Sequence, residues 1–274
     1  MKKIYISFLL FLLTLVLHSQ EITNGNDIFF SSIESGDIIK VRELISQGAD
    51  VNAVNGEGWS ALHIAVKANN VAIVKELLSN KKINMDPILP VDTILMDGEN
   101  KWYADGQTPL LLASYYGYSD LVTILINYGA DIMAKDTIDD AMAIHIASAK
   151  GYHNVVSAIL EASKNSSTDM VNVGDNTGTS PLMWAAMNNQ VSVIAILLKY
   201  NANVNLQDDD GWTALHFASA SDSYRAVEII LRNKADANIT DIEGKKAIDL
   251  TSDRDIQALL NKYTNNIEST ESTN

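Results

Sequence analysis

Apolar residues recur along the chain at spacings that predict pairs of short helices. The run ALHIAV (61–66) is followed by a second apolar set in which neighbours lie three to four residues apart: Val71, Val74, Leu77 and Leu78. That spacing places apolar side chains on one face of a helix. Ser or Thr at positions 60, 108, 180 and 213 can cap a helix N-terminus, and Pro109 and Pro181 then occupy the first helical position.

The predicted helix pair repeats with a period near 33 residues. One pattern occurs in GWSALHIAV (58–66), GQTPLLLAS (106–114), GTSPLMWAA (178–186) and GWTALHFAS (211–219), and AMAIHIAS (141–148) is a copy without the glycine. The shared alanine stands at Ala65, Ala113, Ala147, Ala185 and Ala218, with gaps that exceed 33 by 15, 1, 5 and 0 residues. Equal steps outward reach Ser32 and Thr251, so seven units share one phase. Such units cannot bury an apolar face alone and must stack.

These units resemble ankyrin repeats, whose T-P-L-H-x-A signature appears here as TALHFA (213–218) and SALHIA (60–65). The resemblance implies an all-α solenoid of about seven stacked helix–turn–helix units with β-turn fingers. We expect a repeat domain at 20–263, with units near 26–53, 55–84, 103–134, 136–164, 175–205, 208–238 and 241–263. The resemblance also implies polar terminal caps, and the apolar-poor segment 264–274 is predicted to be a disordered tail.

The first residues have the pattern of a secretory signal peptide. Lys2 and Lys3 precede an apolar run at 4–17, which ends before Ser19. The run is short for a membrane-spanning helix. We expect cleavage after Ser19 and an exported protein, periplasmic or secreted. Because Leu17 is larger than the residue usually found at that position, an uncleaved anchor is the alternative.

Composition limits the kinds of partner. The net charge is −14, and removing residues 1–19 would take away two lysines and no acid. A field of that sign repels nucleic acid and anionic membrane surfaces and favours a protein with a basic patch. We therefore expect a monomer that binds another protein, without nucleic acid and without membrane contact after signal cleavage. No cysteine is present, so neither disulfides nor thiol chemistry is available.

The chemistry-bearing residues do not assemble into a catalytic or metal site in the sequence. His63, His145 and His216 share one register position in alternate units, roughly 20 Å apart, too far to share a metal. The resemblance implies that they are structural. GEGWSA (56–61) matches a dinucleotide fingerprint without the strand that the fingerprint requires, and DDDG (208–211) lacks a first calcium ligand. We expect no cofactor and no enzyme activity.

Recognition by ankyrin repeats usually involves residues beside the turn glycine and those two or three places after the signature alanine. Aromatic anchors among polar groups suit a protein interface. The resemblance and the insertion described below nominate Trp59, Lys67, Trp102, Tyr103, Tyr115, Tyr116, Met187, Asn188, Asp209, Asp210 and Trp212. Local packing of Trp59 and Trp212 across adjacent turns is an equal alternative, and Trp184 is expected in the core.

Two units depart from the common pattern. An insertion loop at about 80–105 carries Trp102 and Tyr103. We expect it to fold over the concave face, and we expect deletion of residues 85–99 to weaken binding with little effect on stability. A tolerated, functionless insertion is the alternative. The fourth unit has Asp139 and Asp140 where the turn glycine belongs and Met142 in place of the capping hydroxyl, so the array is predicted to open first near 136–150.

The sequence therefore predicts a protein-binding module that uses the concave face of an ankyrin solenoid. One narrower alternative is an immunity-type inhibitor of a cationic enzyme. Another class is an envelope scaffold or structural protein. The third is an enzyme whose site lies in the 80–105 loop, with Asp92 or Asp97 as the acid to test.

Overall fold

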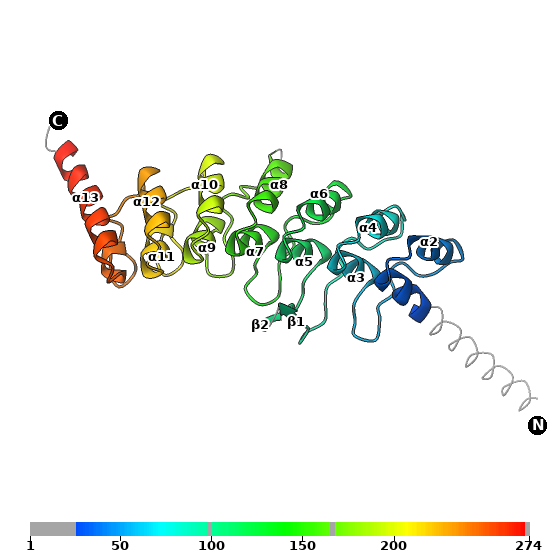
Figure 1. The fold of residues 1–274 in the computed structure, drawn as a ribbon. Coiled ribbons are helices and arrows are strands. Elements are labelled where there is room, and N and C mark those ends of the chain that lie inside the picture. Colours follow the sequence, from blue (N-terminus) through cyan, green and yellow to red (C-terminus); the bar gives the residue numbers. More distant parts are fainter. Residues whose placement is uncertain (1–25, 98–99, 165–167, 272–274) are drawn as a thin grey trace, which may run out of the picture.

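The computed structural model describes residues 26–97, 100–164 and 168–271. The expected signal peptide and its cleavage site lie outside these residues. Within them the chain forms an elongated stack of helix pairs, with the first and the last described helices at opposite ends of the stack (Figure 1). The predicted all-α solenoid is confirmed.

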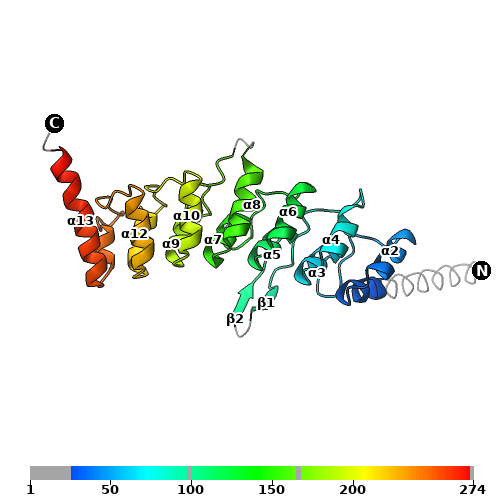
Figure 2. The same cartoon turned by 45° about the horizontal axis from the view of Figure 1, so that its top comes forward.

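Each unit contributes one helix to an inner layer and one to an outer layer (Figures 1 and 2). The inner layer contains residues 26–34, α3 (Ala61–Lys67), α5 (Pro109–Tyr115), α7 (Ala143–Lys150), α9 (Pro181–Met187), α11 (Ala214–Ala220) and the 3-10 helix η1 (Ala247–Leu250). The outer layer contains α2 (Ile38–Ser46), α4 (Val71–Leu78), α6 (Ser119–Asn127), α8 (His153–Ser163), α10 (Val191–Lys199), α12 (Tyr224–Arg232) and α13 (Arg254–Glu271). The apolar faces of both layers form one continuous core along the stack.

Side-chain hydroxyls fix where four inner helices begin. The Oγ of Ser60 accepts a hydrogen bond from the backbone N–H of His63, and Thr108, Ser180 and Thr213 cap α5, α9 and α11 in the same way. Met142 occupies this position before α7, and its side chain makes no cap hydrogen bond. A lost cap costs about 0.5–2 kcal/mol.

Asparagine and aspartate side chains join neighbouring units along the stack. The Oδ1 of Asn52 accepts from the backbone N–H of Asn84 at 2.7 Å. Equivalent bonds join other neighbouring units, each from a backbone N–H to a side-chain Oδ1: from Asp131 to Asp86, from Asn203 to Asn172 and from Asp236 to Asn205. Between the third and fourth units the corresponding residue is Met133, two places after Asp131, and its side chain has no oxygen to accept the bond. This junction therefore lacks a bond that the four junctions named above have.

The fourth unit also has a strained turn. Where the other fingers have a glycine, Asp140 adopts φ 54°. A left-handed conformation costs a side-chain-bearing residue roughly 1 kcal/mol. Three local deficits, in the cap, the turn and the junction, coincide in one unit.

We expect residues 136–150 to exchange their amide hydrogens faster than residues 180–200 under native conditions. Local opening needs less free energy where fewer hydrogen bonds and caps must be broken. Hydrogen exchange followed by mass spectrometry measures this directly. Equal protection of the two segments would show that the deficits are compensated by packing around the buried Ile144 and Ala147.

The insertion enlarges the finger of the third unit. Its first part, residues 87–93, crosses the finger of the second unit, where a Cβ on Gly58 would lie 2.3 Å from Cγ of Pro90. Strands β1 (Ile94–Asp97) and β2 (Asn100–Tyr103) then form an antiparallel hairpin in which Leu95 pairs with Trp102. Both views show the hairpin projecting beyond the finger side of the stack (Figures 1 and 2). The expectation that the loop covers the concave face is therefore wrong.

The last helix is longer than expected. α13 runs to Glu271, past the point where the sequence predicted a disordered tail at 264–274. Ile256 and Leu260 are buried, and Leu259 and Tyr263 pack against the core. Ile267 follows Tyr263 at the same four-residue spacing. Residues 272–274 lie outside the described part of the chain.

Candidate functional site: the concave face

The three buried histidines connect successive units. The Nε2 of His63 donates to the carbonyl of Gln107 at 3.0 Å, that of His145 to Val173 at 3.0 Å and that of His216 to Lys245 at 3.3 Å. Each Nδ1 faces its own cap: the backbone N–H of Met142 donates to His145, and that of Thr213 donates to His216. The rings are therefore neutral, with the proton on Nε2. Their role is structural, as the resemblance implied.

Burial keeps these rings neutral. Desolvation lowers the pKa of His63 from 6.5 to about 4, against a smaller raising effect of its hydrogen bond to Gln107. Burial also lowers the pKa of His145 and of His216. A protonated Nδ1 would point a hydrogen at the cap N–H groups of α7 and α11, which also need an acceptor. These side chains are accordingly held in one tautomer.

The concave face, the surface formed by the inner helices and the fingers, carries most of the nominated residues. Its helix positions are those two and three places after the signature alanine, which the common phase places along one line. In the first unit the same phase places Glu34 level with Lys67. Our sequence reasoning missed Glu34, because the first unit lacks the signature turn, although a step of 33 residues back from Lys67 reaches it.

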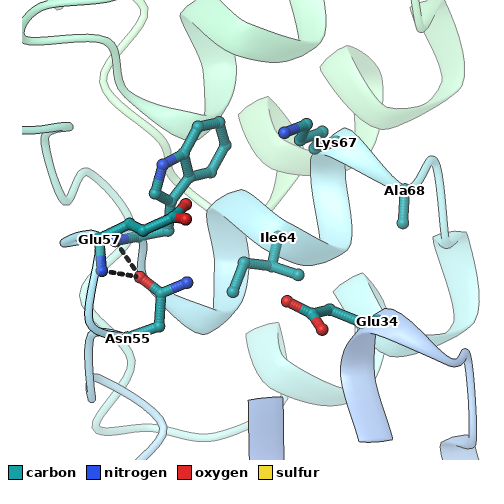
Figure 3. A pocket seen from close by; sticks show the side chains of 7 residues that line it. Glu34, Asn55, Glu57, Ile64, Lys67 and Ala68 are labelled. Atoms are coloured by element: carbon teal, nitrogen blue, oxygen red, sulfur yellow. Dashed lines mark hydrogen bonds between the residues drawn. The ribbon is translucent and has the colours of Figure 1, made fainter. Parts of the chain in front are cut away.

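At the N-terminal end of the concave face lies a groove of about 300 Å³. We call it the N-terminal groove, and it is lined by Glu34, Asn55, Glu57, Trp59, Ile64, Lys67 and Ala68. Figure 3 shows Glu34 and Glu57 on opposite sides of Ile64, which forms the floor between them. The Oδ1 of Asn55 accepts from the backbone N–H groups of Glu57 and Trp59 at 3.0 and 2.9 Å, which fixes this finger.

Trp59 is less accessible than expected. Its side chain is 6% exposed, and the ammonium of Lys67 lies 4.6 Å from the ring centroid. A cation over an indole ring is a favourable contact. The ring of Trp59 is therefore covered by Lys67 and is not an exposed anchor, whereas Lys67 itself is exposed.

Tyr115 is also buried, contrary to the exposure expected of a contact residue. It is 4% exposed, and the ammonium of Lys150 from the next unit lies 4.1 Å from its ring centroid. Tyr116 is half-buried; it meets Tyr115 edge-on at 5.3 Å and stacks on Tyr118 at 5.4 Å. The surface at this point of the concave face is therefore Lys150 together with the edge of a tyrosine cluster.

Aromatic and thioether side chains gather at the C-terminal half, in what we call the C-terminal patch: Trp184, Met187, Trp212 and Phe217. Met187 is 43% exposed, and the half-buried rings of Trp212 and Phe217 lie 5.0 Å apart. Trp184, expected in the core, is half-buried, and its indole N–H donates to Asp175 at 2.8 Å. Asn188 is exposed beside Met187. This patch combines apolar area with polar neighbours.

The finger tips of the fifth to seventh units are joined by backbone hydrogen bonds. The N–H of Asp209 donates to the carbonyl of Thr177 at 3.0 Å, and the N–H of Ile242 donates to that of Asp210 at 3.1 Å. The side chains of Asp209 and Asp210 are exposed. Their backbones thus hold the stack together, and their carboxylates add negative charge to the edge of the concave face.

The remaining nominated pair lies on the hairpin, apart from the concave face. Tyr103 is 53% exposed and pairs with Ile94 across the strands. The side chain of Trp102 lies outside the described residues, so its contribution stays a prediction. The structure brings the other nominated residues together along the inner helices and fingers.

A metal site and a membrane-spanning helix were sought in the described part of the chain. Among these residues no three His, Cys, Asp or Glu side chains are grouped so as to hold a metal ion. The helices that the structure describes include none long and apolar enough to cross a bilayer.

Comparison with known proteins agrees with this architecture. A family model described as ankyrin repeats (3 copies) matches residues 7–88, 31–136, 87–169 and 144–241. The human ASB11 ankyrin repeat domain superposes with a TM-score of 0.68 at 23% identity, covering 86% of this chain and 96% of that one. The ankyrin repeat domain of Bcl-3 gives 0.71 at 23% identity, covering 85% and 97%.

Curated relatives are similar over part of their length. The chain is 31% identical over 186 residues to the transient receptor potential cation channel subfamily A member 1 of Homo sapiens, with 58% of this chain and 16% of that protein covered. It is 29% identical to a protein of Arabidopsis thaliana named as an E3 ubiquitin-protein ligase, covering 62% and 36%, and to the B-cell lymphoma 3 protein homolog of Mus musculus, covering 55% and 38%.

The matched region is thus well under half the length of each relative, so the activities of those whole proteins are not assigned to this chain. What they share with this chain is the repeat array. Ankyrin repeat domains are protein–protein interaction modules, and their fold is generally a non-catalytic binding scaffold. Because the family model covers most of the chain, the chain belongs to the ankyrin repeat family.

Proposed function

We propose that this chain is an exported, non-enzymatic binding protein. Its concave face recognises a basic patch on a partner protein. The observation that carries the proposal is the C-terminal patch, where Met187, Trp212 and Phe217 present partly exposed apolar area between the polar Asn188 and the acidic Asp209 and Asp210. Apolar and aromatic anchors with a polar rim are typical of protein interfaces.

Charge supports a basic partner. The chain carries −14, and Asp209, Asp210 and Glu57 are exposed along the edge of the concave face. Electrostatic complementarity speeds encounter more than it strengthens the final complex. Association is therefore expected to slow as salt rises, while the apolar contacts of the C-terminal patch preserve binding.

Export is part of the proposal and rests on the lysine-initiated apolar run at the N-terminus. It decides which proteins are available as partners, namely those of the cell envelope or the surroundings. The monomeric state is proposed from the net charge of −14, since a large net charge opposes self-association.

The test is capture from envelope extract of the source cells, with residues 20–274 as bait, at low and at physiological salt. The proposal expects one partner of basic character, retained at both salts with a lower yield at the higher one, in a one-to-one complex by size-exclusion chromatography. Several weakly held proteins or self-association would favour the scaffold alternative. A partner that is an enzyme and loses activity on binding would favour the inhibitor alternative.

A further inference from the structure

The N-terminal groove has two carboxylates that the fold does not use. Glu34 comes from the inner helix of the first unit and Glu57 from the finger of the second, and both side chains are exposed. Neither carboxylate takes part in a hydrogen bond or ion pair with the residues that the structure describes. By contrast, Asn55 in the same groove accepts two backbone N–H groups and is structural.

The charges of the groove favour a cation. Glu34 and Glu57 contribute two negative charges, and Lys67, which lies over the ring of Trp59, contributes one positive charge. An anion would meet a net negative site. A metal ion is disfavoured, because the described residues provide no third His, Cys, Asp or Glu there. An organic cation remains as the chemistry that fits.

The shape of the groove favours a side chain with an apolar stem. Ile64 lies between the two carboxylates as the floor, and the volume of about 300 Å³ suits one long side chain (Figure 3). An alkyl stem resting on Ile64 keeps its charged head toward the carboxylates, as lysine and arginine stems do on apolar surfaces. Between these two, a guanidinium has donors along several edges and can serve carboxylates on both walls, whereas an ammonium is a point charge.

We propose that the N-terminal groove receives an arginine side chain of the partner, held by Glu34 and Glu57 with its stem on Ile64. This inference rests on the proposed function and assigns to the basic partner one anchoring residue. It places the anchor at one end of the concave face, with the C-terminal patch at the other. The positive charge of Lys67 repels the arginine and so weakens its binding, but the two carboxylates together carry more charge than Lys67.

The test is a titration of the ¹⁵N-labelled protein with Nα-acetyl-arginine amide, followed by NMR. The neutral isostere Nα-acetyl-citrulline amide is the control for shape, and Nα-acetyl-lysine amide is the control for the guanidinium. Saturable shifts are expected at the amides of Glu34, Trp59 and Ile64, weaker shifts with the lysine compound and none with the citrulline compound. Equal shifts with citrulline, or shifts spread over all finger tips, would overturn the proposal.

Variants separate the groove from the general acidity of the surface. Glu34→Gln/Glu57→Gln should weaken arginine binding at least ten-fold, and Lys67→Met, which keeps an apolar cover on Trp59, should strengthen it several-fold. Asp120→Asn/Asp255→Asn removes as much charge from the outer helices α6 and α13 and should leave it unchanged. All these positions are exposed, so the variants are expected to fold. An unchanged affinity in Glu34→Gln/Glu57→Gln would contradict the assignment.

The outcomes for the groove and for the proposed function are distinguishable. If a captured partner binds Glu34→Gln/Glu57→Gln as tightly as the original protein, the arginine anchor is wrong while the binding function stands. If the arginine probe binds as described and no partner is captured, the groove stands while the proposed function fails.

Discussion

Lowering the pH from 7 to 5 is expected to destabilise the repeat stack, by about 2 kcal/mol through His63 alone. Burial lowers the pKa of His63 from 6.5 to about 4 in the folded protein. Between these pH values the unfolded chain binds a proton at His63 and the folded chain does not. The contribution of His63 to stability is therefore fully present above pH 6.5 and is lost as the pH falls through this window. His145 and His216 act in the same direction, because burial lowers their pKa values too.

Carboxylates act in both directions as the pH falls. Burial raises the pKa of Asp86, Asp139 and Asp208, so their protonation restores some stability as the pH falls further. Desolvation, the largest single influence, raises the pKa of Asp175, but hydrogen bonds, among them those from the N–H and hydroxyl of Thr177, together hold this pKa below its usual 3.8. The stability that the ionised Asp175 contributes is therefore lost only in stronger acid. The histidine effect is therefore best measured above pH 5.

Urea unfolding at pH 7, 6 and 5 measures the effect, in enough salt to screen the net charge of −14. The midpoint should fall steadily over this range. His63→Gln is the matched variant, since it removes one titrating ring: it should be less stable at pH 7 but lose less stability between pH 7 and 5. A midpoint independent of pH would contradict the burial of neutral rings at the unit junctions.

Leu89→Ala is expected to destabilise the protein by about 2–5 kcal/mol, the usual cost of removing a buried leucine side chain. Leu89 lies in the insertion, yet it is 1% exposed. Its backbone N–H donates to the carbonyl of Gln107 at 3.0 Å, the same carbonyl that accepts from His63, and its own carbonyl accepts from Gly106 at 3.1 Å. The start of the insertion is thus part of the core.

Ile88→Ala is the control, because the neighbouring side chain is 64% exposed and its loss should change stability by about 0.5 kcal/mol or less. Denaturant midpoints of the two variants give the comparison. Equal and small losses would show that residues 87–93 do not pack as described. The structure also corrects the expectation that residues 85–99 can be deleted with little effect on stability, since Asp86 and Leu89 both lie in that range.

Most of the fold follows from the sequence because its determinants are local and repeated. The capping hydroxyls, the signature alanine and the spacing of apolar residues occur in several units. A pattern that would be weak evidence in one unit is therefore strong evidence when it repeats. The structural role of the histidines was implied by the resemblance to ankyrin repeats. The length of α13 was missed, because polar residues after Tyr263 resemble a disordered tail although the apolar spacing continues.

The candidate surface was less predictable, because exposure depends on which neighbouring side chain covers a residue. Tyr115 lies at a surface register position, yet Lys150 from the neighbouring unit covers its ring. Trp59 is covered by Lys67 of its own unit. These contacts depend on side-chain rotamers, which a repeat pattern does not specify. Glu34 could have been found, since the phase of the repeat alone places it level with Lys67.

The central claim, that the concave face binds the partner, is tested most directly by one affinity comparison. The captured partner would be titrated against Met187→Ala/Asn188→Ala, on the concave face, and against Tyr224→Ala/Arg225→Ala, on the outer helix α12; Met187 and Tyr224 are each 43% exposed. The account predicts a loss of at least ten-fold in affinity for the first variant and none for the second. Equal affinities, or a loss confined to the α12 variant, would contradict it.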